Sequence, residues 1–323
     1  MDAKRTIVPF LLLLALWLGA GRAWAVCTTV NPAVSLGSVS SFTLNASAQG
    51  NLGGAGLTCG SFLALLAANY VQVTLQSAAP VLSDGNGNSI PLKVFVSNGG
   101  AEITPGSTVQ LSSLAVLALL TNATTGINLY FQAQAANVPA GTYTASVVFT
   151  WRYAICESGA LNLCSWQRSP GVTQNCPAGL CGTPTNWGTG VTATSTVTLV
   201  VTKACALNSY QNVDLGSQAL VSQFTSVTRA ITLTCTSDEG YLVSFDNGQN
   251  YQAPWRRMAS GANHLGYNIY FPNTTTVWNT TQNLSQKGTG LQQTVNFQVT
   301  VDPTQANVPV GTYIDNVTLI INY

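Results

Sequence analysis

Short segments in which apolar and polar residues alternate fill most of the chain after residue 25. They are rich in Val, Ile, Thr, Tyr and Phe and are separated by Gly, Asn, Asp and Pro, as is typical of antiparallel strands joined by turns. No later stretch has the periodicity and caps of a helix, so the pattern predicts an all-β fold. The segments expected to be strands are Val71–Gln76, Leu92–Val96, Ile127–Gln132, Tyr143–Trp151, Ile231–Cys235, Val295–Val301 and Val317–Tyr323.

The order of motifs in residues 27–153 is repeated in residues 205–323. Each copy opens on a cysteine, followed by Leu-Gly-Ser and a second cysteine. Each copy then reaches Asn-Val-Pro-x-Gly-Thr-Tyr, at residues 137–143 and 307–313, and continues as a strand pattern. Two copies of this length suit two domains of ordinary size. The repeat therefore predicts two immunoglobulin-like antiparallel β-sandwiches in tandem.

The first copy has one strand pattern that the second copy lacks. In Val191–Val201, apolar side chains alternate with threonines, which is typical of a half-buried strand. We expect it to be the last strand of domain 1, residues 26–202. Nothing in domain 2, residues 203–323, corresponds to it. Domain 2 is then expected to lack its last strand and to offer an apolar groove to a strand from another molecule. The residues expected to flank this groove are Val317, Leu319, Ile321 and Tyr323.

A simpler alternative is that the last strand of domain 2 pairs at a sheet edge and that nothing is missing. Long unpaired edges promote aggregation, however, and proteins usually cover them. The direct comparison between the two copies therefore favours a missing strand.

Residues 1–25 have the pattern of a cleaved secretory signal. Lys4 and Arg5 form its basic end, Ile7–Leu18 is its apolar stretch, and Ala23-Trp24-Ala25 is a small-x-small cleavage site. A membrane anchor is the alternative, but the apolar run is short for a spanning helix. We therefore expect export.

Charge and composition exclude several classes of function. Charged residues are 7% of the chain and the net charge is +1, which excludes the basic surface of a nucleic-acid binder. The single histidine, His264, has no recognisable carboxylate partner, and no G-x-S-x-G motif is present. Asp84–Asn88 is slightly like a calcium loop but lacks the terminal glutamate, so a hairpin turn is expected. We predict no enzymatic activity, no cofactor and no metal.

The eight cysteines follow an export signal and are expected to form disulfides. None has the C-x2-C spacing of a zinc site. Cys27–Cys59 and Cys205–Cys235 close loops of similar length at matching places in the repeat. The other four cysteines allow three pairings, of which Cys156–Cys164 and Cys176–Cys181 give the shortest loops.

Three loops at one end of domain 1 are unusually apolar. In an immunoglobulin-like sandwich the B–C, D–E and F–G loops emerge from the same end. They are expected at residues 62–68, 114–120 and 152–190, whereas the B–C loop of domain 2, Thr236–Gly240, is polar. The alternative is that the first two runs are buried pieces of domain 1. The residues expected to bind a surface are Phe62, Leu63, Leu65, Leu66, Leu114, Val116, Leu117, Leu119, Leu120, Leu161, Leu163, Trp166, Leu180 and Trp187.

The Cys…Leu-Gly-Ser…Cys openings and the Gly-Thr-Tyr-x-x-x-Val endings resemble the spore coat U domain, the subunit family of archaic chaperone–usher pili. Residues 257–258 and 265–270 (Arg-Met, then Leu-Gly-Tyr-Asn-Ile-Tyr) resemble it too. The resemblance covers almost all of domain 2 and the two ends of domain 1, whose middle has diverged. A two-domain chain of this kind is similar to the tip adhesins of these pili.

The resemblance implies a set of partners and a location. Subunits of this family lack their last strand and receive one from the N-terminal extension of the next subunit, or temporarily from a periplasmic chaperone, before export through an outer-membrane usher. Here Cys27 falls near the expected mature N-terminus, so the chain is expected to accept a strand but to donate none, as a pilus tip does.

The expected function is attachment and biofilm formation by a protein displayed at the cell surface. The apolar loops are expected to bind hydrophobic surfaces or a host or abiotic receptor. Two alternatives stay open: a carbohydrate-binding lectin tip, and a secreted spore-coat or matrix protein that is not mounted on a fibre.

Overall fold

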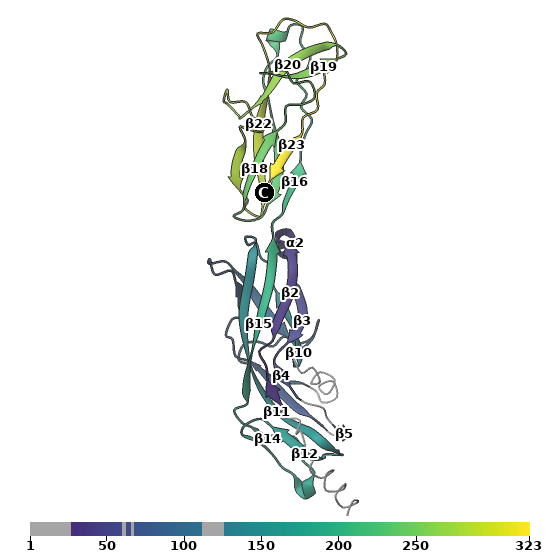
Figure 1. Ribbon diagram of the computed structural model, residues 1–323, viewed down its shortest axis with the longest axis vertical. Helices are drawn as coiled ribbons and strands as arrows, with labels where there is room; N and C mark the ends of the chain where they lie inside the picture. The colour runs from purple at the N-terminus through teal and green to yellow at the C-terminus, as the bar shows by residue number, and fades with distance from the viewer. Residues whose placement is uncertain (1–26, 60–62, 66–67, 112–125) are drawn as a thin grey trace, which may run out of the picture.

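The computed structural model describes residues 27–59, 63–65, 68–111 and 126–323. Nearly all of the regular structure is β-strand, arranged in two bodies that lie end to end (Figure 1). We call the body built from β1 to β15 the first sandwich and the body built from β16 to β23 the second sandwich. The predicted all-β class is confirmed. The predicted signal, residues 1–25, lies outside the described residues.

The first sandwich is built around one branched sheet. Its main path contains β2 (Ala33–Ser40), β15 (Val191–Thr202), β11 (Gly141–Ala160), β7 (Val81–Ser83), β8 (Ser89–Phe95), β10 (Asn128–Ala133) and β3 (Gln49–Gly54), in that order. The remaining strands are β1 (Thr28–Thr29), β4 (Leu57–Thr58), β5 (Leu63–Leu65), β6 (Tyr70–Leu75), β9 (Thr108–Leu111), β12 (Leu163–Arg168), β13 (Val172–Gln174) and β14 (Pro184–Trp187).

The second sandwich has two separate sheets. One contains β16 (Cys205–Ser209), β17 (Val227–Cys235), β22 (Gln292–Val301), β20 (Asn263–Tyr270) and β19 (Arg256–Ser260), in that order. The other places β18 (Gly240–Phe245) between β21 (Leu284–Lys287) and β23 (Leu319–Asn322). All strand neighbours in both sheets are antiparallel.

Each sandwich has its own apolar core. Trp151 is fully buried in the first core and donates its indole N–H to the carbonyl of Ala55 at 2.8 Å. Trp278 is fully buried in the second core and donates to the carbonyl of Val243 at 2.9 Å. Burying a tryptophan with its N–H satisfied contributes a large apolar area without an unpaired donor.

Strand β11 is much longer than the predicted Tyr143–Trp151. It continues to Ala160, so the region expected to be an insertion loop, residues 152–190, begins as strand and contains β12, β13 and β14. Residues 153–156 are all buried, so side chains on both faces of β11 are covered where it pairs with β6 and β12. Burial on both faces removes the alternation from which the end of a strand is usually predicted.

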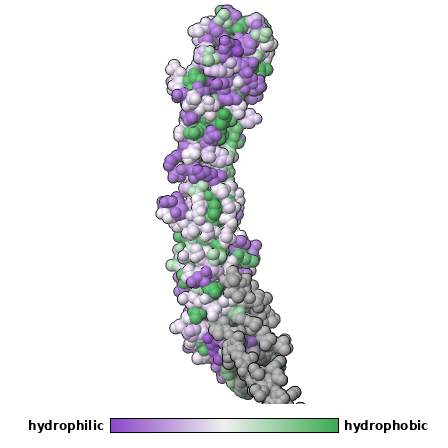
Figure 2. Space-filling view, viewed as in Figure 1, coloured by the Kyte–Doolittle hydropathy of each residue, from purple (hydrophilic) through white to green (hydrophobic). Residues whose placement is uncertain are grey.

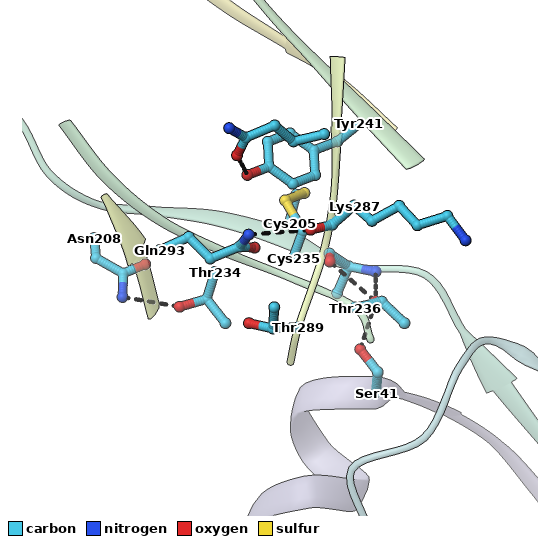
Figure 3. The surroundings of a disulfide bond; sticks show 12 residues. Ser41, Cys205, Asn208, Thr234, Cys235, Thr236, Tyr241, Lys287, Thr289 and Gln293 are labelled. Carbon is cyan, nitrogen blue, oxygen red and sulfur yellow. Dashed lines mark hydrogen bonds between the residues drawn. A yellow bond between two sulfur atoms is a disulfide. The ribbon is translucent and has the colours of Figure 1, made fainter. Parts of the chain in front are cut away.

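The structure joins all four expected cysteine pairs: Cys27–Cys59, Cys156–Cys164, Cys176–Cys181 and Cys205–Cys235. The last of these lies beside the junction between the two sandwiches (Figure 3). There the hydroxyl groups of Ser41 and Thr236 are 2.6 Å apart and both residues are buried. Asn137 also donates across the junction to the carbonyl of Thr289 at 2.9 Å.

The α-helix α2 (Ser41–Ala46) lies at this junction and is capped by the Ser40 side chain, which accepts from the Thr43 N–H. Two 3-10 turns, at Pro177–Gly179 and Val221–Gln223, complete the regular structure of the described residues. Within that part of the chain, no helix combines the length and hydrophobicity needed to cross a bilayer.

Candidate strand-acceptor groove and distal surface

In the first sandwich, β15 fills the space between β2 and β11. It runs parallel to β2 and antiparallel to β11, with Val197 opposite both Val34 and Ala145. Its alternate side chains point into the core, and none of them is more than 2% exposed. These inward residues are Ala193, Ser195, Val197, Leu199 and Val201.

The second sandwich has counterparts of both neighbours of β15. Residues 212–219 correspond to β2, because Leu215-Gly216 aligns with Leu36-Gly37 and both glycines have positive φ. Residues 311–323 correspond to the start of β11, because Gly311-Thr312-Tyr313 aligns with Gly141-Thr142-Tyr143. Among the described residues, no strand lies between these two segments.

An open groove of about 600 Å³ occupies the place that corresponds to β15. One wall comes from residues 207–215 and the other from residues 313–319. Figure 2 shows hydrophobic residues reaching the surface of the second sandwich at the height of β16 and β23. The aliphatic, methionine and phenylalanine residues that line the groove are Leu207, Val213, Leu215, Ile231, Phe245, Met258, Ile269, Phe297, Val299, Ile314, Val317 and Leu319.

The two segments beside the groove have little regular structure. Residues 212–218 form no strand, and residues 311–318 form only one bridge, between Ile314 and Ala259. Their counterparts in the first sandwich are continuous strands that pair with β15. The difference follows from the missing neighbour, since a strand without a partner on one side loses half of its ladder hydrogen bonds.

Two of the four residues expected to flank the groove line it. Val317 and Leu319 are in its wall. Ile321 pairs with Val243 in β18 and is half-buried against the core. Tyr323 is 57% exposed and does not line the groove, because β23 ends at Asn322.

The sequence analysis missed the opposite wall of the groove, formed by Leu207, Val213 and Leu215. The repeat contained the information needed to predict this wall. Leu36 is buried beneath β15 in the first copy, and its counterpart Leu215 is only half-buried in the second. Comparing the strand before the groove, as well as the strand after it, would have found these residues.

Polar groups also line the groove. The hydroxyl of Tyr267 donates to Oδ2 of Asp315 at 2.6 Å, and the backbone N–H of Gln249 donates to Oδ1 at 2.9 Å. Burial, then the hydrogen bond to Asp315, raise the pKa of Tyr267. Arg256 is buried nearby and donates to the carbonyls of Phe245, Asp246 and Trp278. Burial lowers the pKa of Arg256.

Both copies of the Gly-Thr-Tyr motif make the same corner. Tyr143 donates its hydroxyl to the carbonyl of Pro139 at 2.8 Å, and Tyr313 donates to the carbonyl of Pro309 at 2.7 Å. This tyrosine corner is a recurrent feature of immunoglobulin-like sandwiches. It fixes the start of the strand that follows, even where that strand has no partner.

The far end of the first sandwich, away from the second, carries β5, β12 and β14 (Figure 1). The predicted surface residues Leu63 and Leu65 are in β5, which pairs in parallel with the end of β11. The run was expected to be a loop, so that expectation is wrong for residues 63–65, whose backbone gains ladder hydrogen bonds from β11. The remaining predicted residues of the first two runs lie outside the described residues: Phe62, Leu66, Leu114, Val116, Leu117, Leu119 and Leu120.

Three predicted leucines of the third region are exposed at this end. Leu161 is 64% exposed, Leu163 is 56% and Leu180 is 44%. Leu161 lies in the turn between β11 and β12, where positive φ is required, and Leu163 forms a bridge with Leu180. The disulfides Cys156–Cys164 and Cys176–Cys181 hold the two loops that carry them.

The two predicted tryptophans are half-buried and lie on separate hairpins. Trp166 on β12 stacks on Tyr70 with 6.2 Å between ring centroids, and its buried indole N–H has no partner within the described part of the chain. Trp187 ends β14. Asn162, in the turn between β11 and β12, links the segment before β6 to the loop closed by Cys176–Cys181. Its side chain accepts from the Ala68 N–H, and its carbonyl accepts from the Cys181 N–H.

The polar B–C loop of the second sandwich does not lie at a free end of the molecule. It faces the first sandwich, where Thr236 meets Ser41 and Glu239 pairs with Lys203 at 2.8 Å. The polar sequence of Thr236–Gly240 is thus explained by its place at the interdomain junction.

Residues considered for chemistry form no site. His264 lies on β20 opposite Ala259. Asp84 accepts from the N–H groups of Asn86 and Asn88 in the turn between β7 and β8. Within the described ranges, no three His, Cys, Asp or Glu side chains come together as metal ligands would.

Comparison with known proteins agrees with this architecture. Residues 191–319 match the family model of the Spore Coat Protein U domain. No curated protein sequence matches the chain. The chain is similar to a solved chaperone–tip subunit pre-assembly complex, CsuC–CsuE, from the archaic chaperone–usher Csu pili of Acinetobacter baumannii. The identity is 22%, the TM-score is 0.60, and the match covers 92% of this chain and 100% of that chain.

A weaker likeness, to the adhesive subunit CfaE of the CFA/I fimbria of enterotoxigenic Escherichia coli, has 10% identity and a TM-score of 0.36. It covers 91% of this chain and 93% of that chain, and is too distant to support an argument. The resemblance to the spore coat U domain stated from the sequence is therefore confirmed by the family match over residues 191–319. The likeness to the Csu complex shows that the chain shares that fold.

Proposed function

We propose that this chain is the tip adhesin of an archaic chaperone–usher pilus, with residues 203–323 as a strand-accepting pilin domain and residues 26–202 as the adhesive domain. The observation that carries the proposal is the groove in the second sandwich, at the position that β15 fills in the first. An extended segment is the occupant that fits, because β15 itself shows which shape and pattern fill that position.

The first sandwich supplies a template for the missing strand. A segment placed like β15 would run antiparallel to residues 311–323 and parallel to residues 212–219. It would turn alternate side chains towards Val213, Leu215 and Val317. Burying one valine or leucine side chain contributes about 1.5–3 kcal/mol. Four or five such residues approach the whole stability of a domain, about 5–15 kcal/mol, so completing the groove should change this sandwich greatly.

The extent of the family match supports the same mechanism. The matched region begins at Val191, the first residue of β15, and only Lys203 and Ala204 separate β15 from β16. The spore coat U module of this chain thus starts with a strand that completes the preceding sandwich. A corresponding strand from another subunit would complete the second sandwich in the same way.

We infer the partners from the resemblance to the subunits of archaic chaperone–usher pili, with the groove as the place where a strand would bind. A periplasmic chaperone supplies a temporary strand to the groove, an outer-membrane usher exports the complex, and the next subunit supplies the permanent strand. The chain is exported through the periplasm, with residues 1–25 as its signal, and is displayed at the cell surface on the pilus tip.

Attachment is assigned to the far end of the first sandwich. The exposed Leu161, Leu163 and Leu180 gather there on disulfide-held loops, at the end opposite the groove. Rigid apolar loops bind hydrophobic surfaces at low entropic cost and favour biofilm formation. The stacked Tyr70 and Trp166 favour one rival, a lectin tip, because aromatic faces also bind sugars.

The test of the groove is a synthetic peptide with the sequence of Val191–Thr202, added to the full mature chain. Thermal unfolding of the second sandwich should shift upward with peptide concentration, since a ligand that binds only the folded state stabilises it. A control peptide with aspartate at the positions of Val197, Leu199 and Val201 should have no effect. Equal behaviour of the two peptides would contradict strand acceptance.

The test of attachment is retention on polystyrene with excess free glycans present. The lectin alternative predicts release by glycans, and the hydrophobic alternative predicts none. Serine at Leu161, Leu163 and Leu180 should lower retention and leave secretion intact. Normal retention by this variant would contradict the apolar-loop assignment.

A further inference from the structure

The wall of the groove that precedes β23 is held in place although no strand pairs with it on the groove side. Residues 313–318 have one backbone bridge to β19, in which Ile314 and Ala259 exchange N–H···O bonds of 2.9 and 3.0 Å. Further attachments come from the Asp246 N–H, which donates to the Thr318 carbonyl, from the Asn316 side chain, which donates to Gln249, and from two carboxylates, Asp246 and Asp315. These side chains replace part of the ladder that a neighbouring strand would provide.

The contacts of Asp246 are not peculiar to the second sandwich. Asp246 accepts from the Thr318 N–H at 2.9 Å and donates its own N–H to the Thr318 carbonyl at 3.0 Å. In the first sandwich the corresponding N–H of Val148 is bonded to the Ser77 hydroxyl at 3.0 Å, and the Val148 carbonyl accepts from the Gln76 N–H. A side chain therefore caps this position in both sandwiches, with or without a strand in the neighbouring position.

The contacts of Asp315 have no such counterpart. By the repeat, Asp315 corresponds to Ala145, a buried residue of β11 that lies opposite Val197 of β15. Tyr267 corresponds to Val94, which is fully buried. The first sandwich has apolar side chains at both positions. The second has a tyrosine and a carboxylate joined by a 2.6 Å hydrogen bond.

The bond between Tyr267 and Asp315 connects three parts of the sandwich. Tyr267 lies on β20, Asp315 lies in the groove wall, and the Gln249 N–H that also donates to Asp315 lies in the loop after β18. A hydrogen bond to an ionised acceptor is about twice as strong as a neutral one. The three groups therefore fasten the groove wall to the sheet behind it at the point where no strand is paired.

We propose that Tyr267 and Asp315 form a clamp that keeps the groove wall, residues 313–318, in its strand-accepting position before a partner strand binds. The inference rests on the proposed strand-acceptor function. Without the clamp, the unpaired segment would have free access to the groove beside it, and Val317, which has no strand partner, would collapse into it. The clamp thus raises the fraction of molecules that are ready to bind, and apparent affinity scales with that fraction.

The test measures binding kinetics of the Val191–Thr202 peptide to the full mature chain and to Tyr267→Phe and Asp315→Ala variants. Both variants should bind about fivefold more slowly or worse, with peptide dissociation changed by less than about twofold, because the defect lies in the free groove. Asp315→Asn, which keeps one acceptor oxygen, should give an intermediate rate. Loss of a residue with a merely structural role would not change the association rate while leaving the dissociation rate unchanged.

Tyr241→Phe is the matched control. Tyr241 is as deeply buried as Tyr267 and donates its hydroxyl to Gln286 at 2.9 Å, close to the Cys205–Cys235 disulfide (Figure 3). It is not among the residues that line the groove. This variant should bind the peptide at the rate of the unmodified chain. Equal slowing in Tyr241→Phe and Tyr267→Phe would overturn the clamp, as would binding of Tyr267→Phe at the unmodified rate.

Hydrogen exchange of the free chain separates this inference from the proposed function. Amides of residues 313–318 should exchange faster in Tyr267→Phe than in Tyr241→Phe. If the peptide binds neither the unmodified chain nor a variant but this difference is found, strand acceptance fails, and Tyr267 and Asp315 hold the wall without preparing it for a strand. If exchange is the same in both, the clamp fails whatever the peptide does. Tyr267→Phe removes only one oxygen atom and is expected to fold. It therefore tests the clamp even if Asp315→Ala does not fold.

Discussion

The two sandwiches carry the same succession of motifs, yet one is complete and the other is open. In the first, β15 lies between β2 and β11, and the residues Val34, Leu36, Tyr143 and Val147 of these two neighbours are buried beside it. In the second, the counterparts of these residues are half-exposed along a groove. The presence of one strand therefore distinguishes the closed sandwich from the open one, and β15 shows what kind of segment fills this position in the closed copy.

The largest effect is expected from a charge placed under β15. Val197→Asp should destabilise the first sandwich by more than about 4 kcal/mol, because it buries an unpaired carboxylate between β2 and β11. Val200→Asp is the matched control, since Val200 is on the same strand and is 37% exposed. Urea unfolding of the full chain measures both. Similar losses in the two variants would mean that β15 does not complete the first core.

A smaller effect should distinguish the equivalent residues Leu36 and Leu215. Leu36→Ala should cost about 2–5 kcal/mol, as expected for a buried leucine. Leu215→Ala should cost less than half of that in the free chain, because Leu215 faces an open groove. When the Val191–Thr202 peptide is bound, the two costs should converge. Thermal unfolding with and without peptide measures them, and equal costs in the free chain would contradict the open groove.

Acid should weaken the second sandwich through Asp246. Burial acts to raise the pKa of this carboxyl, but hydrogen bonds from Thr318 and from the Gly248 N–H outweigh it, and the pKa is lowered. A carboxyl with a lowered pKa stabilises the folded state above its unfolded pKa of about 3.8 and loses that contribution as the pH falls below it. Unfolding measured from pH 6 to about 2 should show this loss, and Asp246→Asn should flatten it. An unchanged profile in Asp246→Asn would exclude this carboxyl as the source.

The smallest effect on stability is expected at the far end of the first sandwich. Serine at Leu161, Leu163 and Leu180 should change the free energy of unfolding by less than about 0.5 kcal/mol for each residue, because all three are exposed. Retention on hydrophobic polystyrene should nevertheless fall. A large loss of stability would show instead that these leucines belong to the core.

The sequence was sufficient to predict the fold class, the repeat and the position of the extra strand, because alternation and repeated motifs are local signals. It predicted Val317 and Leu319 in the groove wall for the same reason. Tyr323 continues the alternation but lies beyond β23, and alternation cannot show where a partner strand ends.

Other features depend on long-range packing and were beyond the sequence pattern. The length of β11 was missed because residues 153–156 are buried on both faces. The polar loop Thr236–Gly240 was contrasted with its apolar counterpart, but its place at the junction depends on Ser41, far away in the sequence. The change from Ala145 to Asp315 was visible in the repeat. Its meaning required the position of Tyr267.

Hydrogen exchange on a chain completed covalently tests the central claim most directly. A copy of Val191–Thr202, attached after Tyr323 through a short flexible linker, can fold back antiparallel to residues 311–323 as β15 does on β11. We predict that amide protection in residues 311–318 rises to the level of residues 141–148, and that the same linker with a scrambled strand leaves it unchanged. Protection of residues 311–318 that is already equal to that of residues 141–148 in the unmodified chain, or that does not rise in the completed one, would contradict an open second sandwich.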